Sequence, residues 1–185
     1  MNVFLTSDHH FFHGNIIKYC SRPFRDVSHM NAEMLSRING AVAQDDTLLI
    51  VGDLTAGLGG RLEELRSIIG AMHGKKLLIR GNHDHQPDEW YLASGFHRVL
   101  PHINLGGVLV THFSLIEAVS RGIDIDALGT VEHVVHGHTH SVDTPDLENH
   151  FNVAVDRHAF DPVDYRRAIP ENLQTPFIDS LRHNL

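Results

Sequence analysis

The stretch VEHVVHGHTHS, residues 131–141, ends with three histidines in five positions, His136, His138 and His140. They close a short apolar run typical of a buried strand, where a core needs no imidazole and a loop more often uses Asn, Asp or Ser. The chain has 17 histidines in 185 residues, several times the ordinary share. Because imidazole binds metal ions and titrates near neutral pH, this content indicates metal chemistry or proton transfer.

Polar side chains that could take part in such chemistry also follow four other apolar runs. They occur in SDHHFFHGN, VGDLT, IRGNHDHQ and THFS. In α/β sheets ligands bind beyond the carboxyl ends of strands, so five strand ends should bring these side chains to one region. One His or Asp after a strand is usually a turn or surface residue, but eight at five strand ends are hard to attribute to turns. The eight candidates are Asp8, His10, Asp53, Asn82, His83, His112, His138 and His140.

The types of these side chains narrow the chemistry. Carboxylates, imidazoles and one amide oxygen, with no thiolate, suit Mn²⁺, Fe²⁺ or Zn²⁺. Eight donors are too many for one tetrahedral zinc site, which takes about four ligands. They suit two ions that share a bridging carboxylate, an arrangement that stabilises both the attacking and the leaving oxygen in phosphoryl transfer.

Short apolar runs and amphipathic stretches alternate along the chain and predict the elements that position these side chains. Strands are expected at 2–6, 47–51, 76–79, 108–111, 133–136 and 151–155. Helices are expected at 31–44, 61–74 and 88–94, with Gly74 ending the second. This alternation favours a layered α/β domain.

The length of 185 residues suits a single domain, residues 1–185. Its core is expected over about residues 1–160, and the proline-containing residues 161–185 are expected to form a surface-lying tail. The single cysteine, Cys20, excludes an internal disulfide and is expected to be a half-buried core residue.

Charge and hydropathy exclude several classes of partner. The net charge of −8 argues against a large nucleic-acid surface, although bound cations would still allow a phosphate substrate. Apolar runs of about five residues are far short of a membrane span. The first residues, MNVFLTSDHH, do not resemble a secretion signal, so a cytoplasmic location is expected.

Five short motifs, in this order, resemble the calcineurin-like metallophosphoesterase family, especially its small bacterial and phage members without a cap domain. Each motif alone is common, but the full set is specific. The resemblance implies a four-layer α-β-β-α sandwich of two mixed β-sheets flanked by helices, although periodicity alone also allows one doubly wound sheet. The motifs are Asp8-His9-His10, Gly52-Asp53, Gly81-Asn82-His83-Asp84, His112 and Gly137-His138-Thr139-His140.

The resemblance also implies a role for each matching residue. His83 would protonate the leaving group, and Asp84 would orient His83, with a turn-stabilising role for Asp84 as the open alternative. Two divalent ions would share Asp53; Mn²⁺ is favoured, with Fe, Zn²⁺, Ni²⁺ or Co²⁺ as alternatives. The first ion would take Asp8, His10, Asp53 and His140, and the second Asp53, Asn82, His112 and His138.

The implied reaction is hydrolysis of a small phosphate ester, with a nucleotide-like diester favoured, by a hydroxide held between the two ions. A non-catalytic metal-binding scaffold and a mononuclear metalloprotein remain as alternatives, and no obligate nucleic-acid partner is expected. His13 and Asn15 are candidate substrate contacts, with helix capping as the other reading. His9 and His136 alternate with proposed ligands and should therefore face away from the metals.

Overall fold

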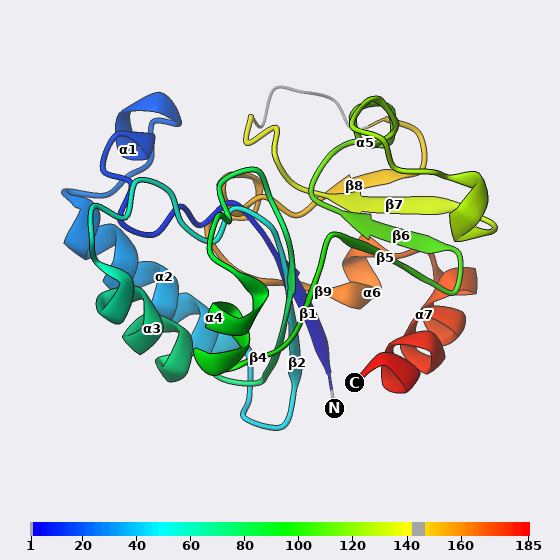
Figure 1. Cartoon of the computed structure of the whole chain (residues 1–185), viewed down its shortest axis with the longest axis horizontal. Coiled ribbons are helices and arrows are strands. Elements are labelled where there is room, and N and C mark those ends of the chain that lie inside the picture. The colour runs from blue at the N-terminus through cyan, green and yellow to red at the C-terminus, as the bar shows by residue number, and fades with distance from the viewer. Residues whose placement is uncertain (1, 142–146) are drawn as a thin grey trace.

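Two mixed β-sheets face each other in the computed structural model, which describes residues 2–141 and 147–185 (Figure 1). The first sheet has the strand order β4-β3-β2-β1-β9, and the second has the order β5-β6-β7-β8. All neighbouring strands are parallel except the edge pairs β1–β9 and β5–β6. The strands are β1 (Val3–Thr6), β2 (Thr47–Val51), β3 (Lys75–Ile79), β4 (Phe96–Leu100), β5 (His102–Leu105), β6 (Val108–Thr111), β7 (His133–His136), β8 (His150–Asn152) and β9 (Val163–Asp164).

Strand β2 shows how the core is divided. All its residues are buried, as expected for a strand covered on both faces. Leu48 and Ile50 pack in a cluster with residues of α2 (Val27–Ala41), α3 (Leu62–Ala71) and α4 (Asp88–Ala93). Leu49 and Val51 point the other way and join residues of the second sheet. The helices therefore cover one face of the first sheet, and the second sheet covers the other.

Short elements occupy the loops beyond the strand ends. Helix α1 (Ile16–Tyr19) follows β1, and α5 (Leu115–Ser120) follows β6. Single turns of 3₁₀ helix lie at Asp126–Leu128 and Val155–Arg157. None of the helices in the described part of the chain has an apolar stretch long enough to cross a bilayer.

The six strands and three helices expected from the sequence are present, with bounds shifted by a few residues. The sixth strand is shorter than expected, because β8 ends at Asn152 and Val155 already begins a 3₁₀ turn. Strands β4 and β5 were not predicted. They are half-exposed edge strands with the mixed sequences FHRVL and HINL, so they lack the continuous apolar run of a central strand.

The prediction of a surface-lying tail at residues 161–185 is wrong. Val163 and Asp164 form β9 beside β1, and α6 (Tyr165–Ala168) and α7 (Glu171–Asn184) follow. The side chains of Leu173, Phe177 and Leu181 are buried in the cluster between the sheets. These three residues recur every fourth position, which is a helical stripe. Prolines at 170 and 176 obscured that stripe in the sequence.

Candidate metal centre

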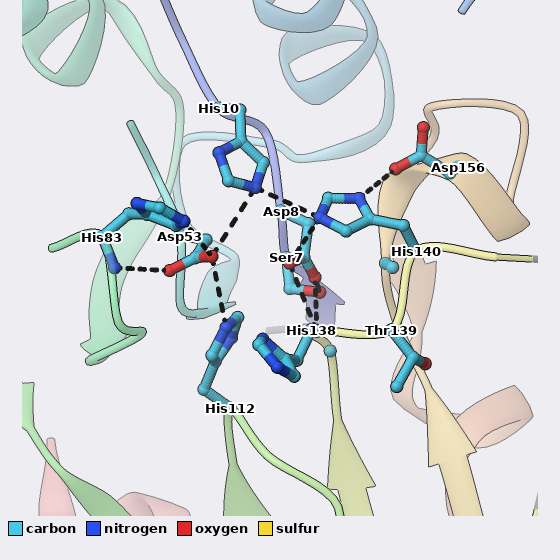
Figure 2. A network of polar contacts seen from close by, with 12 residues as sticks. Ser7, Asp8, His10, Asp53, His83, His112, His138, Thr139, His140 and Asp156 are labelled. Atoms are coloured by element: carbon cyan, nitrogen blue, oxygen red, sulfur yellow. Dashed lines mark hydrogen bonds and ion pairs between the residues drawn. The ribbon is translucent and has the colours of Figure 1, made fainter. Parts of the chain in front are cut away.

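Strand ends from both sheets bring the predicted carboxylates and imidazoles together (Figure 2). Parallel strands finish at a common edge of their sheet, and here loops that follow strands of both sheets converge. The loop after β1 carries Asp8 and His10, and the loop after β2 carries Asp53. The remaining loops follow β3, β6 and β7 and carry Asn82, His83, His112, His138 and His140.

A first group consists of Asp8, His10 and His140, whose ligand atoms all lie within 4.8 Å of one another. The Nε2 atoms of His10 and His140 are 3.2 Å apart. His140 Nε2 is also 3.5 Å from Asp8 Oδ1. Two imidazoles and a carboxylate that converge in this way could hold a divalent cation.

A second group consists of Asp53, His112 and His138. Asp53 Oδ2 is 3.3 Å from His112 Nε2 and 3.6 Å from His10 Nε2, a member of the first group. One carboxylate oxygen therefore lies between the two groups, where a ligand shared by two cations would have to be.

The loop after β3 places His83 beside Asp53 and carries Asn82 directly before it. The backbone N–H of His83 donates to Asp53 Oδ1 at 2.9 Å. The His83 side chain is 44% exposed, and its Nε2 is 4.0 Å from Asp53 Oδ2. His83 thus lies at the open edge of the centre, whereas Asn82 Oδ1 is buried and has no hydrogen-bond partner among the described atoms.

Asp84 differs from its expected role as the residue that orients His83. Its Oδ2 accepts the backbone N–H groups of Asp53 at 2.8 Å and Gly81 at 2.9 Å. Its Oδ1 accepts the N–H of Leu54 at 3.1 Å. Both oxygens are directed at backbone because the buried N–H groups of two loops need acceptors. Asp84 therefore fastens the loop after β2 to the loop after β3, as in the turn-stabilising alternative.

Glycines in three of the motifs lie against the proposed ligands. A methyl group on Gly52 would overlap the ring of His112, and one on Gly81 would overlap the carboxylate of Asp53. The same holds for Gly137 and the carboxylate of Asp8. These glycines are needed because the chain passes too close to the ligands for any side chain.

Backbone strain is concentrated in the same loops. Non-glycine residues with positive φ cost on the order of 1–3 kcal/mol each and persist only where the surrounding structure holds them. Five of the proposed ligands have this conformation, which is consistent with a functional site. They are Asp8 (φ 59°), His10 (51°), Asp53 (52°), His138 (70°) and His140 (39°).

Hydrogen bonds fix the orientation of two imidazoles. His112 Nδ1 is 2.8 Å from the carbonyl oxygen of Val51. His140 Nδ1 is 2.7 Å from Asp156 Oδ2. In both rings Nδ1–H therefore donates to an oxygen outside the centre, and Nε2 faces the centre, as in histidines that bind metals.

Three contributing residues were not predicted as site residues. The guanidinium of Arg22 contacts both oxygens of Asp156, at 2.7 and 2.8 Å. Glu117 Oε1, from α5, is 3.4 Å from His138 Nε2. Asp156 had a signal in the sequence, since it follows the sixth expected strand as Asp53 follows the second. Arg22 and Glu117 lie in ordinary loop and helix sequence without such a signal.

Charge interactions in the centre favour ionised carboxylates. Burial opposes ionisation of Asp53, but the hydrogen bond and charge of His112, aided by His83 and His10, hold its pKa below the ordinary range. Burial lowers the pKa of His10 to about 2, so this imidazole is neutral. Burial also opposes protonation of His112, yet Asp53 and Asp8 raise its pKa to about 9. The ionised carboxylates thus stabilise a positive charge in the centre, here on the protonated His112.

These residues fit divalent cations. Buried polar atoms normally have hydrogen-bond partners, and leaving them without one is costly. Nonetheless Asn82 Oδ1 is buried without a partner among the described atoms, and His112 Nε2 is buried with Asp53 Oδ2, at 3.3 Å, as its contact. A cation would satisfy both atoms and would supply the positive charge that Asp53 otherwise draws from a protonated imidazole.

The remaining predicted residues lie around the centre. The ring of His13 is 5.6 Å from that of His10, so it borders the centre. Asn15 is exposed and precedes α1, and its side chain makes no capping hydrogen bond. His9 faces away and stacks on Phe11 at 5.3 Å. Cys20 is half-buried and packs against the core, as expected.

Comparisons with known proteins give partial similarities. No family model matches the sequence. An uncharacterized protein of Methanocaldococcus jannaschii is 39% identical over 82 residues, 44% of this chain and 46% of that protein. The Gene 66 protein of Mycobacterium phage L5 is 28% identical over 163 residues, 76% of this chain and 78% of that protein. The glycerophosphodiester phosphodiesterase GpdQ of Enterobacter lignolyticus is 35% identical over 79 residues, 42% of this chain and 27% of that enzyme.

The fold itself has a solved counterpart. A protein of unknown function from Aquifex aeolicus superposes with a TM-score of 0.70 over 90% of this chain and 96% of its own, at 22% identity. The nuclease MPE of Pseudomonas putida gives a TM-score of 0.47 over 75% of this chain and 61% of its own. The chain matches less than half the length of the archaeal protein and about a quarter of the GpdQ enzyme.

Proposed function

We propose that this protein is a metal-dependent phosphoesterase that prefers a small, nucleotide-like phosphodiester. The observation that carries the proposal is the position of Asp53 Oδ2 between His10 and His112. A carboxylate shared by two cations is the arrangement that enzymes use in phosphoryl transfer. The partial similarity to a glycerophosphodiester phosphodiesterase supports the same class of reaction.

Two cations, with Mn²⁺ favoured, would be held by the two groups of side chains, with Asp53 contributing to both. When bound, such cations polarise a phosphate ester and activate water near neutral pH. The first would take Asp8, His10 and His140, and the second Asn82, His112 and His138.

The chain itself supplies the acid and its placement. His83, at the exposed edge of the centre, donates a proton to the leaving oxygen. General acid catalysis of this kind is typically worth about 10²–10⁴-fold in rate. The His83 backbone N–H, bound to Asp53 Oδ1, fixes this acid relative to the centre. Asp84 acts on the backbone of the same two loops rather than on the imidazole.

The proposal retains three expectations from the sequence. Residues 1–185 would form one domain in the four-layer arrangement, with the helices α2 to α4 as one outer layer. The protein would be cytoplasmic, and its partner would be a small substrate, consistent with its net charge of −8.

The test measures hydrolysis and metal content together in wild type and three variants. Asp53→Asn should lose hydrolysis of bis(p-nitrophenyl) phosphate with Mn²⁺ and bind fewer ions. His83→Ala should keep the ions, and it should slow an alkyl diester such as cyclic AMP more than the nitrophenyl ester, because an alkoxide needs the proton more. His85→Ala, in the same loop, is the matched control and should resemble wild type.

Two results would contradict the proposal. A wild-type protein that binds two ions but hydrolyses no member of a panel of phosphomonoesters and diesters would be a metal-binding scaffold. Saturation at one ion per chain would contradict a shared Asp53.

A further inference from the structure

A cavity of about 600 Å³ opens beside His140. Figure 2 shows His140, Thr139 and Asp156 on one side of the centre and His83 on the other. The cavity thus adjoins the centre on the side away from the proposed acid. Its lining combines rings with hydroxyl groups and includes Tyr19, Pro23, Phe160, Ser21 and Thr139.

The ring of Tyr19 is the most unusual part of this lining. Its side chain lies at the end of α1 and is 73% exposed, so one face of the ring is open to a ligand. The ring of His13 contacts it edge-on at 6.2 Å, and His13 in turn lies 5.6 Å from His10. A row of rings therefore leads from the centre to the cavity.

Phe160 forms another wall and is fixed by its neighbours. Its ring packs edge-on against Phe24 at 4.7 Å, and the guanidinium of Arg22 lies 5.9 Å from its centroid. A fixed ring on one side and an exposed ring on another offer flat apolar surfaces to a planar group.

We propose that this cavity binds the base of a nucleoside whose phosphate lies at the metal centre. The inference rests on the proposed function and names its substrate class. The volume is within the range of small-molecule sites, about 300–1,000 Å³. Ser21 and Thr139 provide hydroxyls for the polar edge of a base or for a ribose.

Charge further restricts the ligand. Among the described residues that line the cavity, none is Lys or Arg, so nothing there favours a second phosphate. Arg22 already neutralises the charge of Asp156, so this carboxylate does not favour a cationic group in the ligand. A neutral planar base suits these walls better than a polyphosphate or a quaternary amine.

The side of the centre on which the cavity lies decides which part of a diester it holds. The leaving oxygen has to be near His83, which is not among the residues that line the cavity, whereas His140 is. The nucleoside in the cavity is therefore the part of the diester that remains bonded to phosphorus after hydrolysis. The product that contains it is a nucleoside monophosphate.

The test compares the binding of AMP and of glycerol 3-phosphate to the Mn²⁺-loaded full chain by titration calorimetry. Both ligands carry a phosphomonoester, but only AMP carries a base. Wild type should bind AMP at least about tenfold more tightly than glycerol 3-phosphate. Tyr19→Ala should lower the affinity for AMP about tenfold and leave the affinity for glycerol 3-phosphate unchanged, since stacking of a base on one ring is worth about this much. Tyr19→Phe should retain AMP binding, and Leu92→Ala, an exposed apolar residue of α4, is the distant control.

The outcomes separate this inference from the proposed function. Three results would overturn the cavity assignment. The first two are a wild type that binds AMP and glycerol 3-phosphate with equal affinity and a wild type that binds neither. The third is a Tyr19→Ala variant whose affinity for both ligands falls by the same factor. If Tyr19-dependent AMP binding persists while wild type hydrolyses no phosphate ester, the cavity stands and the proposed activity fails. Because Tyr19 is exposed, unfolding temperatures of all variants should match wild type, which checks that each is folded.

Discussion

Asp156 and His140 are in direct contact at the edge of the centre, with His140 Nδ1–H donating to Asp156 Oδ2 at 2.7 Å (Figure 2). The buried guanidinium of Arg22 holds the same carboxylate and also donates to the backbone carbonyls of Asp8 and His9, at 2.8 and 2.9 Å. This network joins the loop after β1 to the turn after β8 and directs His140 Nε2 towards the centre.

Asp156→Asn should therefore weaken binding of Mn²⁺ about 10–100-fold, the usual effect of losing a carboxylate that orients a metal-binding histidine. It should also lower the free energy of unfolding by about 3–5 kcal/mol, because the buried charge of Arg22 loses its partner. Titration calorimetry and urea unfolding measure the two effects. Asp161→Asn, which removes an exposed partner of Arg37, is the control and should change neither. Unchanged metal affinity in a folded Asp156→Asn protein would show that His140 needs no such support.

Gly81→Ala and Gly70→Ala add the same methyl group with opposite expected results. At Gly81 the methyl overlaps Asp53, so metal affinity should fall and stability should decrease by about 1–3 kcal/mol. At Gly70, inside α3, nothing lies within 4 Å, and alanine should stabilise the helix by up to about 1 kcal/mol. Urea unfolding and metal titration distinguish them. A Gly81→Ala protein with normal metal binding would mean that the loop after β3 can move aside.

Asp84→Asn should cost stability as well as activity. Backbone N–H groups bind both carboxylate oxygens of Asp84, and asparagine replaces one of these oxygens by an NH₂ group that cannot accept a hydrogen bond. Each lost bond to a charged group is worth about 1.5–3 kcal/mol. His83→Ala removes an exposed side chain and should leave the free energy of unfolding nearly unchanged, within about 0.5 kcal/mol. If Asp84→Asn instead kept full stability and matched His83→Ala in rate, Asp84 would act through the imidazole after all.

The buried imidazole of His9 predicts a loss of stability in acid. Burial, reinforced by the charge of Arg22, lowers the pKa of His9 to about 3, against an ordinary value of 6.5. The unfolded chain therefore binds more protons between these values, so stability falls as the pH drops from about 6.5 towards 3. In metal-free protein, His9→Gln should flatten this dependence, measured as unfolding free energy against pH. His97→Gln, at an exposed position of β4, should leave the slope unchanged.

Most residues of the candidate centre could be predicted, because each is recognised from its immediate neighbours in the sequence. A polar residue directly after an apolar run lies at a strand end, and parallel strands end at a common edge. Asp156 follows the same rule after the sixth run and could have been included. Glu117 and Arg22 reach the centre from a helix and a loop whose positions depend on packing, so no sequence spacing indicated them.

The sequence by itself determined the types of ligand, the central strands and the helices that cover them, since these depend on side-chain chemistry and on periodicity along a few residues. Tertiary structure decided the rest. It placed Asp53 between two groups of side chains to which both sheets contribute, directed the oxygens of Asp84 at backbone rather than at His83, and buried one face of α7 between the sheets. Each of these depends on contacts between segments far apart in the chain, where the partner of a side chain is set by the shape of the whole fold.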